Sequence, residues 1–149
     1  MLRKLLLAAA VAGGTLFGVA AEAHHSFALY DLAKLNTVVG TVREWKWANP
    51  HCYLVIEVLK ADGTSEQWTL SGSSPNMMSR WGWNAADLVV GEKVTVDIHP
   101  ARDGRHFASM QTVFLPDGKA LVDPAGQPGA ALAAGPTNVP KTPQGVPYK

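Results

Sequence analysis

The sequence has one cysteine, Cys52, in 149 residues, so the chain cannot form an internal disulfide. It also has no run of like charges, and its 13 lysines and arginines nearly balance its 12 aspartates and glutamates. A chain of balanced charge lacks the electrostatic footprint of a nucleic-acid-binding protein. We therefore expect a fold that its hydrophobic core holds without a covalent link, and no nucleic-acid partner.

Long apolar runs are also missing after the N-terminus, where no stretch approaches the ~20 apolar residues that a membrane span needs. Residues 1–23 have the three parts of a secretory signal: Arg3 and Lys4, an apolar run over residues 5–12, and Ala-Glu-Ala at 21–23. Glycines interrupt the apolar segment, which argues against a membrane-spanning helix. We expect a periplasmic or secreted protein whose mature chain has no membrane span.

The C-terminal part of the chain differs in composition from the rest. Residues 123–149 are rich in proline, glycine and alanine, show no apolar period, and contain no aromatic residue before Tyr148. Such a composition is typical of a disordered or extended tail. Residues 24–122 contain no internal repeat and are predicted to form one domain.

The middle of the chain predicts five strands and one short helix. Gly40, inside the first strand, indicates a bulge or a bend, and Ser74 followed by Pro75 is typical of a helix start. This order, β-β-β-α-β-β, is that of the OB-fold, a small five-stranded Greek-key barrel. We predict this all-β fold, with a small β-sandwich as the alternative. The expected strands are residues 37–48, 51–60, 65–70, 93–100 and 106–115.

Alternation along the strands predicts which side chains face the core. In the second strand the core-facing set is Cys52, Leu54, Ile56 and Val58, whereas His51, Tyr53, Val55 and Glu57 face outward. In the fourth strand Val94, Val96 and Ile98 face inward, whereas Lys93, Thr95, Asp97 and His99 face outward. The apolar side of the helix is predicted to consist of Met77, Met78 and Trp81.

Several short motifs resemble those of a bacterial family of small exported proteins, domain of unknown function 6152. They are "AHHSF", Trp47 followed by "ANPH", "RWGW", "GEKVTVDIHPARDG" and "LPDGK", which together extend from about His24 to Ala120. The resemblance implies an exported, single-domain protein. It implies no activity, because none is established for the family.

Two adjacent histidines, His24 and His25, follow the predicted cleavage site. Cleavage after Ala23 would make His24 the first residue, so that its α-amino group and its imidazole could chelate a metal ion. A third nitrogen, from His51 or His99 at the end of a strand, would complete a site of the histidine-brace type. Nitrogen donors favour Cu(II) among the common divalent metals. Cleavage after Ala21 would instead place histidine third, as in the amino-terminal copper-binding tripeptide.

Each of these histidines also has an interpretation without metal. An exposed terminal histidine can be tolerated without a role, and His51 or His99 can serve only to hydrogen-bond a turn beside its proline. His106 stands beside a turn and is predicted to be a surface residue. Cys52 is predicted to be a buried small hydrophobic residue rather than a copper ligand, because it faces the core while His51 faces out.

The tryptophans suggest a second kind of site. Trp45 and Trp47 share a facing on the first strand, where they could line a groove of the kind with which OB-folds bind oligosaccharides. The sequence contains no GxSxG or HExxH motif and no other catalytic spacing, which favours a non-catalytic protein. We expect an exported binding protein for copper or, alternatively, for a small molecule, an oligosaccharide or an envelope protein.

Overall fold

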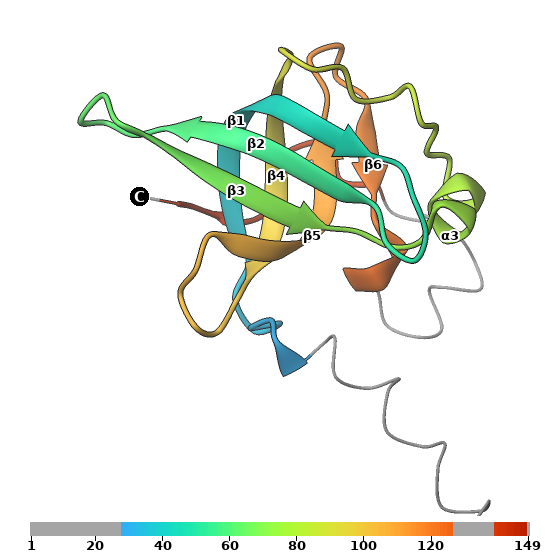
Figure 1. Cartoon of the computed structure of the whole chain (residues 1–149), viewed down its shortest axis with the longest axis horizontal. Coiled ribbons are helices and arrows are strands. Elements are labelled where there is room, and N and C mark those ends of the chain that lie inside the picture. Colours follow the sequence, from blue (N-terminus) through green and yellow to red (C-terminus); the bar gives the residue numbers. More distant parts are fainter. Residues whose placement is uncertain (1–27, 127–138, 149) are drawn as a thin grey trace, which may run out of the picture.

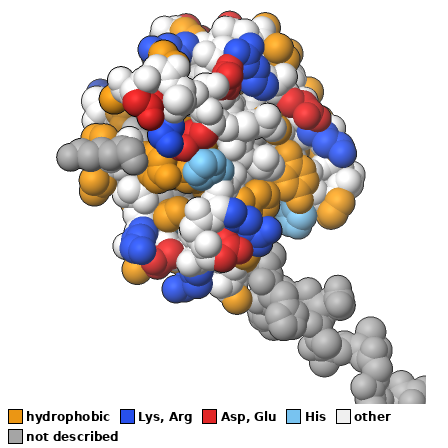
Figure 2. Space-filling model, turned by 60° about the vertical axis from the view of Figure 1, so that its left-hand side comes forward, with side chains coloured by type: hydrophobic (Ala, Val, Ile, Leu, Met, Phe, Trp, Pro, Cys, Tyr) orange, Lys and Arg blue, Asp and Glu red, His pale blue; other side chains and the backbone are white. Residues whose placement is uncertain are grey.

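The computed structural model describes residues 28–126 and 139–148 of the chain (Figure 1). The predicted signal peptide, residues 1–23, and the candidate metal ligands His24 and His25 lie outside these residues. Within the two described ranges, no helix has the length and the apolar character needed to cross a membrane. On the face drawn in Figure 2, basic and acidic side chains lie among one another.

Five strands form a closed barrel, as the sequence predicted. Around the barrel the order is β1-β2-β3-β5-β4, and β1 pairs with both β2 and β4 to close it. The neighbouring strands are antiparallel except β3 and β5, which are parallel. The strands are β1 (Asn36–Lys46), β2 (Tyr53–Leu59), β3 (Ser65–Ser71), β4 (Lys93–Pro100) and β5 (Phe107–Phe114).

The first strand changes partner halfway along its length. From Asn36 to Thr41 it pairs with β4, and from Thr41 to Lys46 it pairs with β2. Gly40 lies at this change, where a Cβ atom would be only 2.9 Å from the carbonyl oxygen of Glu57 and 3.0 Å from Cβ of Ile56. The bend predicted at Gly40 therefore reflects a close approach between β1 and β2 that leaves no space for a side chain.

The barrel interior is apolar, and most of the predicted facings are confirmed. Every predicted core residue of β2 and β4 is at most 9% exposed. Helix α3 (Pro75–Arg80) connects β3 to β4 and begins at the predicted N-cap, Ser74, whose hydroxyl accepts a hydrogen bond from the Met77 N–H. Met78 is fully buried, but the prediction for Met77 is wrong, because this side chain is 39% exposed. A six-residue helix has room for only a narrow buried side.

Two side chains of β4 that were predicted to face solvent are buried. Asp97 is inaccessible and His99 is 7% exposed. Asp97 accepts hydrogen bonds from the main-chain N–H groups of Gln144 and Gly145, which cover it. His99 lies under the segment that precedes β1, with its Nδ1 atom 2.7 Å from the carbonyl oxygen of Lys34. Segments distant in sequence therefore cover the outer face of this strand.

The structure adds a short strand that the sequence did not predict, and it describes residues 123–126 and 139–148 of the predicted tail. Strand β6 (Ala120–Val122) pairs with β5, and a short 3-10 helix, η1 (Pro124–Gly126), follows it. Near the C-terminus, β7 (Val146–Pro147) pairs in parallel with the start of β1. The described C-terminal end of the predicted tail therefore docks on the barrel through a short extended segment.

The close approach at Gly40 generates a stability prediction. We expect Gly40→Ala to lower the free energy of unfolding by about 1–3 kcal/mol, because the added methyl group overpacks the contact with β2. Urea denaturation would show a lower midpoint at unchanged slope. The control is Val39→Thr, because Val39 is 43% exposed on the same strand and should change stability by no more than about 0.5 kcal/mol. Equal effects of the two substitutions would contradict this account.

Candidate functional site

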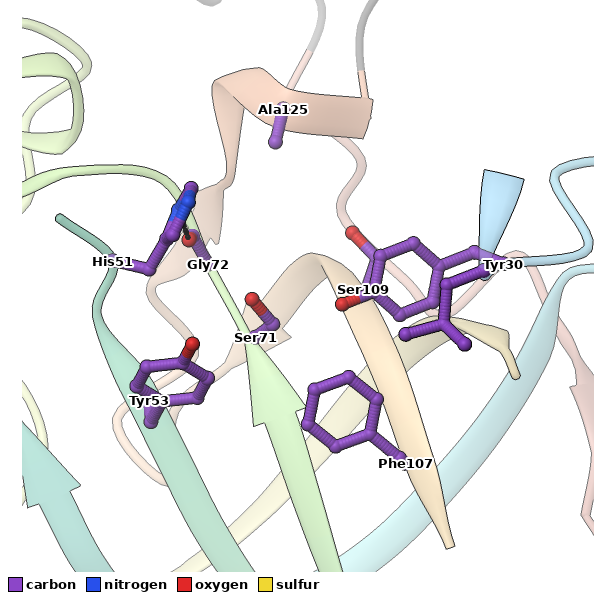
Figure 3. Close-up of a pocket in the computed structure, with 9 residues that line it drawn as sticks. Tyr30, His51, Tyr53, Ser71, Gly72, Phe107, Ser109 and Ala125 are labelled. Carbon is purple, nitrogen blue, oxygen red and sulfur yellow. Dashed lines mark hydrogen bonds between the residues drawn. The ribbon is translucent and has the colours of Figure 1, made fainter. Parts of the chain in front are cut away.

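A cavity of about 210 Å³ lies on the outer face of the barrel, over β2, β3 and β5 (Figure 3). The strands contribute side chains to its wall, as do the β1–β2 loop, the segment before β1, and η1. In OB-folds this face, beside the β1–β2 and β4–β5 loops, is the usual position of ligands. The lining residues are Leu29, Tyr30, His51, Tyr53, Ser71, Gly72, Phe107, Ser109 and Ala125.

Aromatic rings and hydroxyl groups dominate the lining. Tyr30 and Phe107 stack with their ring centroids 5.9 Å apart and their planes inclined by 17°. The Arg105 guanidinium lies over the Phe107 ring, 5.5 Å from its centroid, in a cation–π contact. Figure 3 shows the hydroxyl groups of Tyr30, Tyr53 and Ser71 directed toward the cavity. Burial raises the pKa of the Tyr30 phenol, so this hydroxyl remains neutral at physiological pH.

His51 stands at the rim of the cavity with a defined orientation. Its Nδ1 atom is 3.2 Å from the carbonyl oxygen of Gly72 (Figure 3). A carbonyl oxygen can only accept a hydrogen bond, so Nδ1 must carry the proton. In the neutral ring, Nε2 then has a free lone pair, which can accept a hydrogen bond or bind a metal ion.

A buried carboxylate joins two of the segments that line the cavity. Asp123, which follows β6, is 0% exposed and accepts hydrogen bonds from the N–H and hydroxyl of Ser73, at 2.8 and 2.7 Å. It also accepts one from the N–H of Ala125, at 2.7 Å. Burial raises the pKa of Asp123 despite these donors. The carboxylate therefore ties the loop after β3 to η1, and both segments line the cavity.

Of the metal ligands proposed from the sequence, the structure places only His51 at this cavity. His99 is at the end of β4, and its Nδ1 atom is bonded to the Lys34 carbonyl oxygen. In residues 28–126 and 139–148, no three histidine, cysteine, aspartate or glutamate side chains are arranged to hold a metal ion. A site built on His24 or His25 would require residues outside the described ranges.

The tryptophans proposed as a ligand groove are packed against each other. Trp45 stacks on Trp83 with ring centroids 5.9 Å apart, and Trp47 is tilted against Trp45 at 5.7 Å. The Trp45 indole N–H donates to the carbonyl oxygen of Ala85. Both rings are partly buried against the core, and neither is among the residues that line the cavity.

The remaining single-residue predictions concern Cys52 and His106. Cys52 is fully buried, as predicted, and burial raises the pKa of its thiol to about 11. His106 is a surface residue, also as predicted, but it has specific partners. Its ring stacks on Trp68 at 5.0 Å, and its Nε2 atom is 3.3 Å from the Glu66 carboxylate.

Sequence reasoning singled out His51 as a candidate metal ligand, but it predicted neither the cavity nor the other residues that line it. The alternation of β2 had placed Tyr53 on the same outward face as His51, and this shared facing was the available signal. Tyr30 and Phe107 are 77 positions apart in the chain, and nothing local indicates that their rings stack. An antiparallel bridge between Tyr30 and Ala101, at the end of β4, brings them together.

The buried carboxylate predicts a stability effect that depends on pH. Asp123→Ala leaves the buried N–H groups of Ser73 and Ala125 without an acceptor, which should cost about 2–4 kcal/mol. Asp123→Asn retains one acceptor oxygen and should cost less. The pKa of Asp123 is higher in the folded than in the unfolded chain, where it has its ordinary value of 3.8. The stability that the protonated carboxyl contributes is therefore fully present below pH 3.8 and is lost as the pH rises through the folded pKa.

The measurement is urea denaturation of wild type and Asp123→Asn at several pH values. The difference in their unfolding free energies should shift in favour of wild type as the pH falls, since only wild type has this titrating group. Asp103→Ala, at an exposed turn, is the matched control. A pH-independent difference, or an Asp123→Ala variant as stable as the control, would contradict the proposed role of the carboxylate.

Comparison with known proteins identifies a family without assigning a function. Residues 14–110 match a family described as a family of unknown function, DUF6152. No curated protein and no solved structure matches the chain. The matched range includes the "HHSF" and "NPH" motifs that contain His24, His25 and His51. The chain therefore belongs to the DUF6152 family of unknown function.

Proposed function

We propose that this protein is a non-catalytic binding protein and that the cavity beside His51 is its ligand site. The observation that carries the proposal is the position of a defined cavity on the β2–β3–β5 face, where OB-folds bind ligands. The site offers aromatic surfaces for stacking and several hydroxyl groups for hydrogen bonding. These groups converge on one space, as a specific binding site requires.

The chemistry of the lining favours a small uncharged ligand. Among the described residues, the lining includes no lysine, arginine or carboxylate side chain, so it offers no fixed charge to pair with an ionic ligand. A volume of about 210 Å³ is below the roughly 300–1,000 Å³ typical of sites for drug-sized ligands. A molecule with a single ring, such as one unit of a saccharide or a small aromatic compound, fits these properties.

Binding is favoured over catalysis by the state of the polar groups around the cavity. His51 is hydrogen-bonded to a main-chain carbonyl group rather than to a carboxylate. The nearby Asp123 carboxylate is already the acceptor of three hydrogen bonds and is inaccessible. An acid/base pair of the kind that hydrolytic enzymes use is therefore not assembled from these two residues. The secretory pattern of residues 1–23 supports export to the periplasm or beyond.

Copper binding at the rim of the same cavity is a second candidate. His51 is exposed and has a free Nε2, which suits a metal ligand. Leu29 lines the cavity and lies five residues after His24, a length of chain that reaches at most about 18 Å. These facts favour His51 over the buried His99 as the partner of an N-terminal histidine. A Cu(II) ion at the rim of the cavity would then be within reach of both His51 and an N-terminal histidine.

One experiment tests both candidates on the exported protein. Its intact mass first identifies the mature N-terminus. Calorimetric titration with neutral monosaccharides, small aromatic compounds and Cu(II) is then compared for wild type, His51→Ala and His106→Ala. The control, His106→Ala, also removes an exposed histidine, but one outside the cavity.

For an organic ligand, His51→Ala should weaken binding roughly tenfold, the effect of one lost hydrogen bond, whereas His106→Ala should have no effect. For copper, His24→Ala and one extra N-terminal residue should each weaken binding as strongly as His51→Ala does. If no probe binds, or if His51→Ala and His106→Ala bind as wild type does, the proposed site is wrong.

A further inference from the structure

The described C-terminal residues, 139–148, attach to a barrel that is already closed without them. Strand β7 pairs with the first two residues of β1, through hydrogen bonds from Val146 N–H to Leu35 O at 3.0 Å and from Tyr148 N–H to Thr37 O at 2.9 Å. This edge of β1 is free because β2 pairs with β1 only from Thr41 onward. Figure 1 shows the C-terminal end beneath the projecting β2–β3 hairpin.

A buried carboxylate on β4 holds the main chain of this segment. Asp97 Oδ1 accepts hydrogen bonds from the Thr37 hydroxyl at 2.6 Å and from the Gly145 N–H at 3.2 Å, and its Oδ2 accepts one from the Gln144 N–H at 2.7 Å. Two of the three donors are backbone groups of the docked segment. An inaccessible carboxylate placed in this way recognises an extended main chain, whatever its side chains.

Two positions of the segment add side-chain selectivity. A Cβ atom on Gly145 would lie 2.5 Å from the carbonyl carbon of Asn36, so only glycine fits there. Tyr148 packs edge-on against Trp68, with ring centroids 4.8 Å apart and planes inclined by 78°. By contrast, Val146 between them is 67% exposed, and its side chain makes little contact with the barrel.

We propose that the groove formed by the start of β1, Asp97 and Trp68 is a peptide-binding site for an extended segment of the form Gly-x-x-aromatic. The C-terminal residues Gln144–Tyr148 are its tethered occupant. The binding mode is strand addition, in which main-chain hydrogen bonds provide affinity and a few pockets provide selectivity. The groove is separate from the cavity beside His51, since the two share no lining residue.

The test adds the docked segment in trans to full-length chains that cannot hold their own copy. Gly145→Val and Tyr148→Ala each weaken the tethered contact and leave the groove residues unchanged. The probe is a labelled peptide of residues 142–149, TPQGVPYK, and binding is followed by fluorescence anisotropy. The released variants should bind it roughly tenfold or more tightly than wild type, whose tethered copy competes at a millimolar effective concentration.

Controls separate specific docking from adhesion. A peptide with valine in place of its glycine should not bind. The double variant Asp97→Asn, Tyr148→Ala should not bind the original peptide, whereas the double variant Asp103→Asn, Tyr148→Ala should bind it as Tyr148→Ala does. Circular dichroism checks that each chain is folded, and the peptide variants test the groove even where Asp97→Asn does not fold. Released variants that bind no more tightly than wild type, or equal binding of the valine peptide, would overturn the proposal.

Discussion

The double pairing of β1 is the constraint on which the rest of this structure depends. One strand completes the barrel by pairing with β4 over its first half and with β2 over its second. At the change of partner β1 and β2 approach each other so closely that Gly40 has no space for a Cβ atom. Because β1 closes the barrel, β3 and β5 are neighbours on the side of the barrel opposite β1, where they pair in parallel. Because β2 pairs with β1 only from Thr41 onward, one edge of the first residues of β1 is available to pair with β7.

Barrel closure also creates the cavity, and a buried polar group maintains it. The parallel pairing of β3 with β5 brings Ser71 beside Ser109. The chain then returns through β6, where Asp123 binds the Ser73 end of the β3–α3 loop and the start of η1. The main chain at Gly72 is thereby fixed, and its carbonyl oxygen orients the His51 ring. The segment after β6 is thus linked to the candidate ligand site through the hydrogen bonds of the Asp123 and His51 side chains.

The sequence predicted those features that depend on local alternation. It predicted the order of strands and helix along the chain, the helix start at Ser74 and the outward facing of His51. Each of these features depends on residues that are neighbours in the sequence. The predicted exposure of Asp97 was wrong, because Gln144, 47 positions later in the chain, covers this side chain. Nothing in the sequence indicated that the Trp45 ring stacks on Trp83, which lies beyond α3 in the chain. Contacts between distant segments leave no period in the sequence, so alternation cannot reveal them.

The central claim is that His51 is the oriented polar group of a ligand site. Two-bond ¹H–¹⁵N NMR spectra of the histidine rings test it most directly, because they identify the tautomer of each ring. The account predicts that neutral His51 carries its proton on Nδ1, and that its Nε2 resonance changes first when Cu(II) or a bound neutral ligand is added. A proton on Nε2, or a ligand that changes His99 or His106 and leaves His51 unchanged, would contradict it.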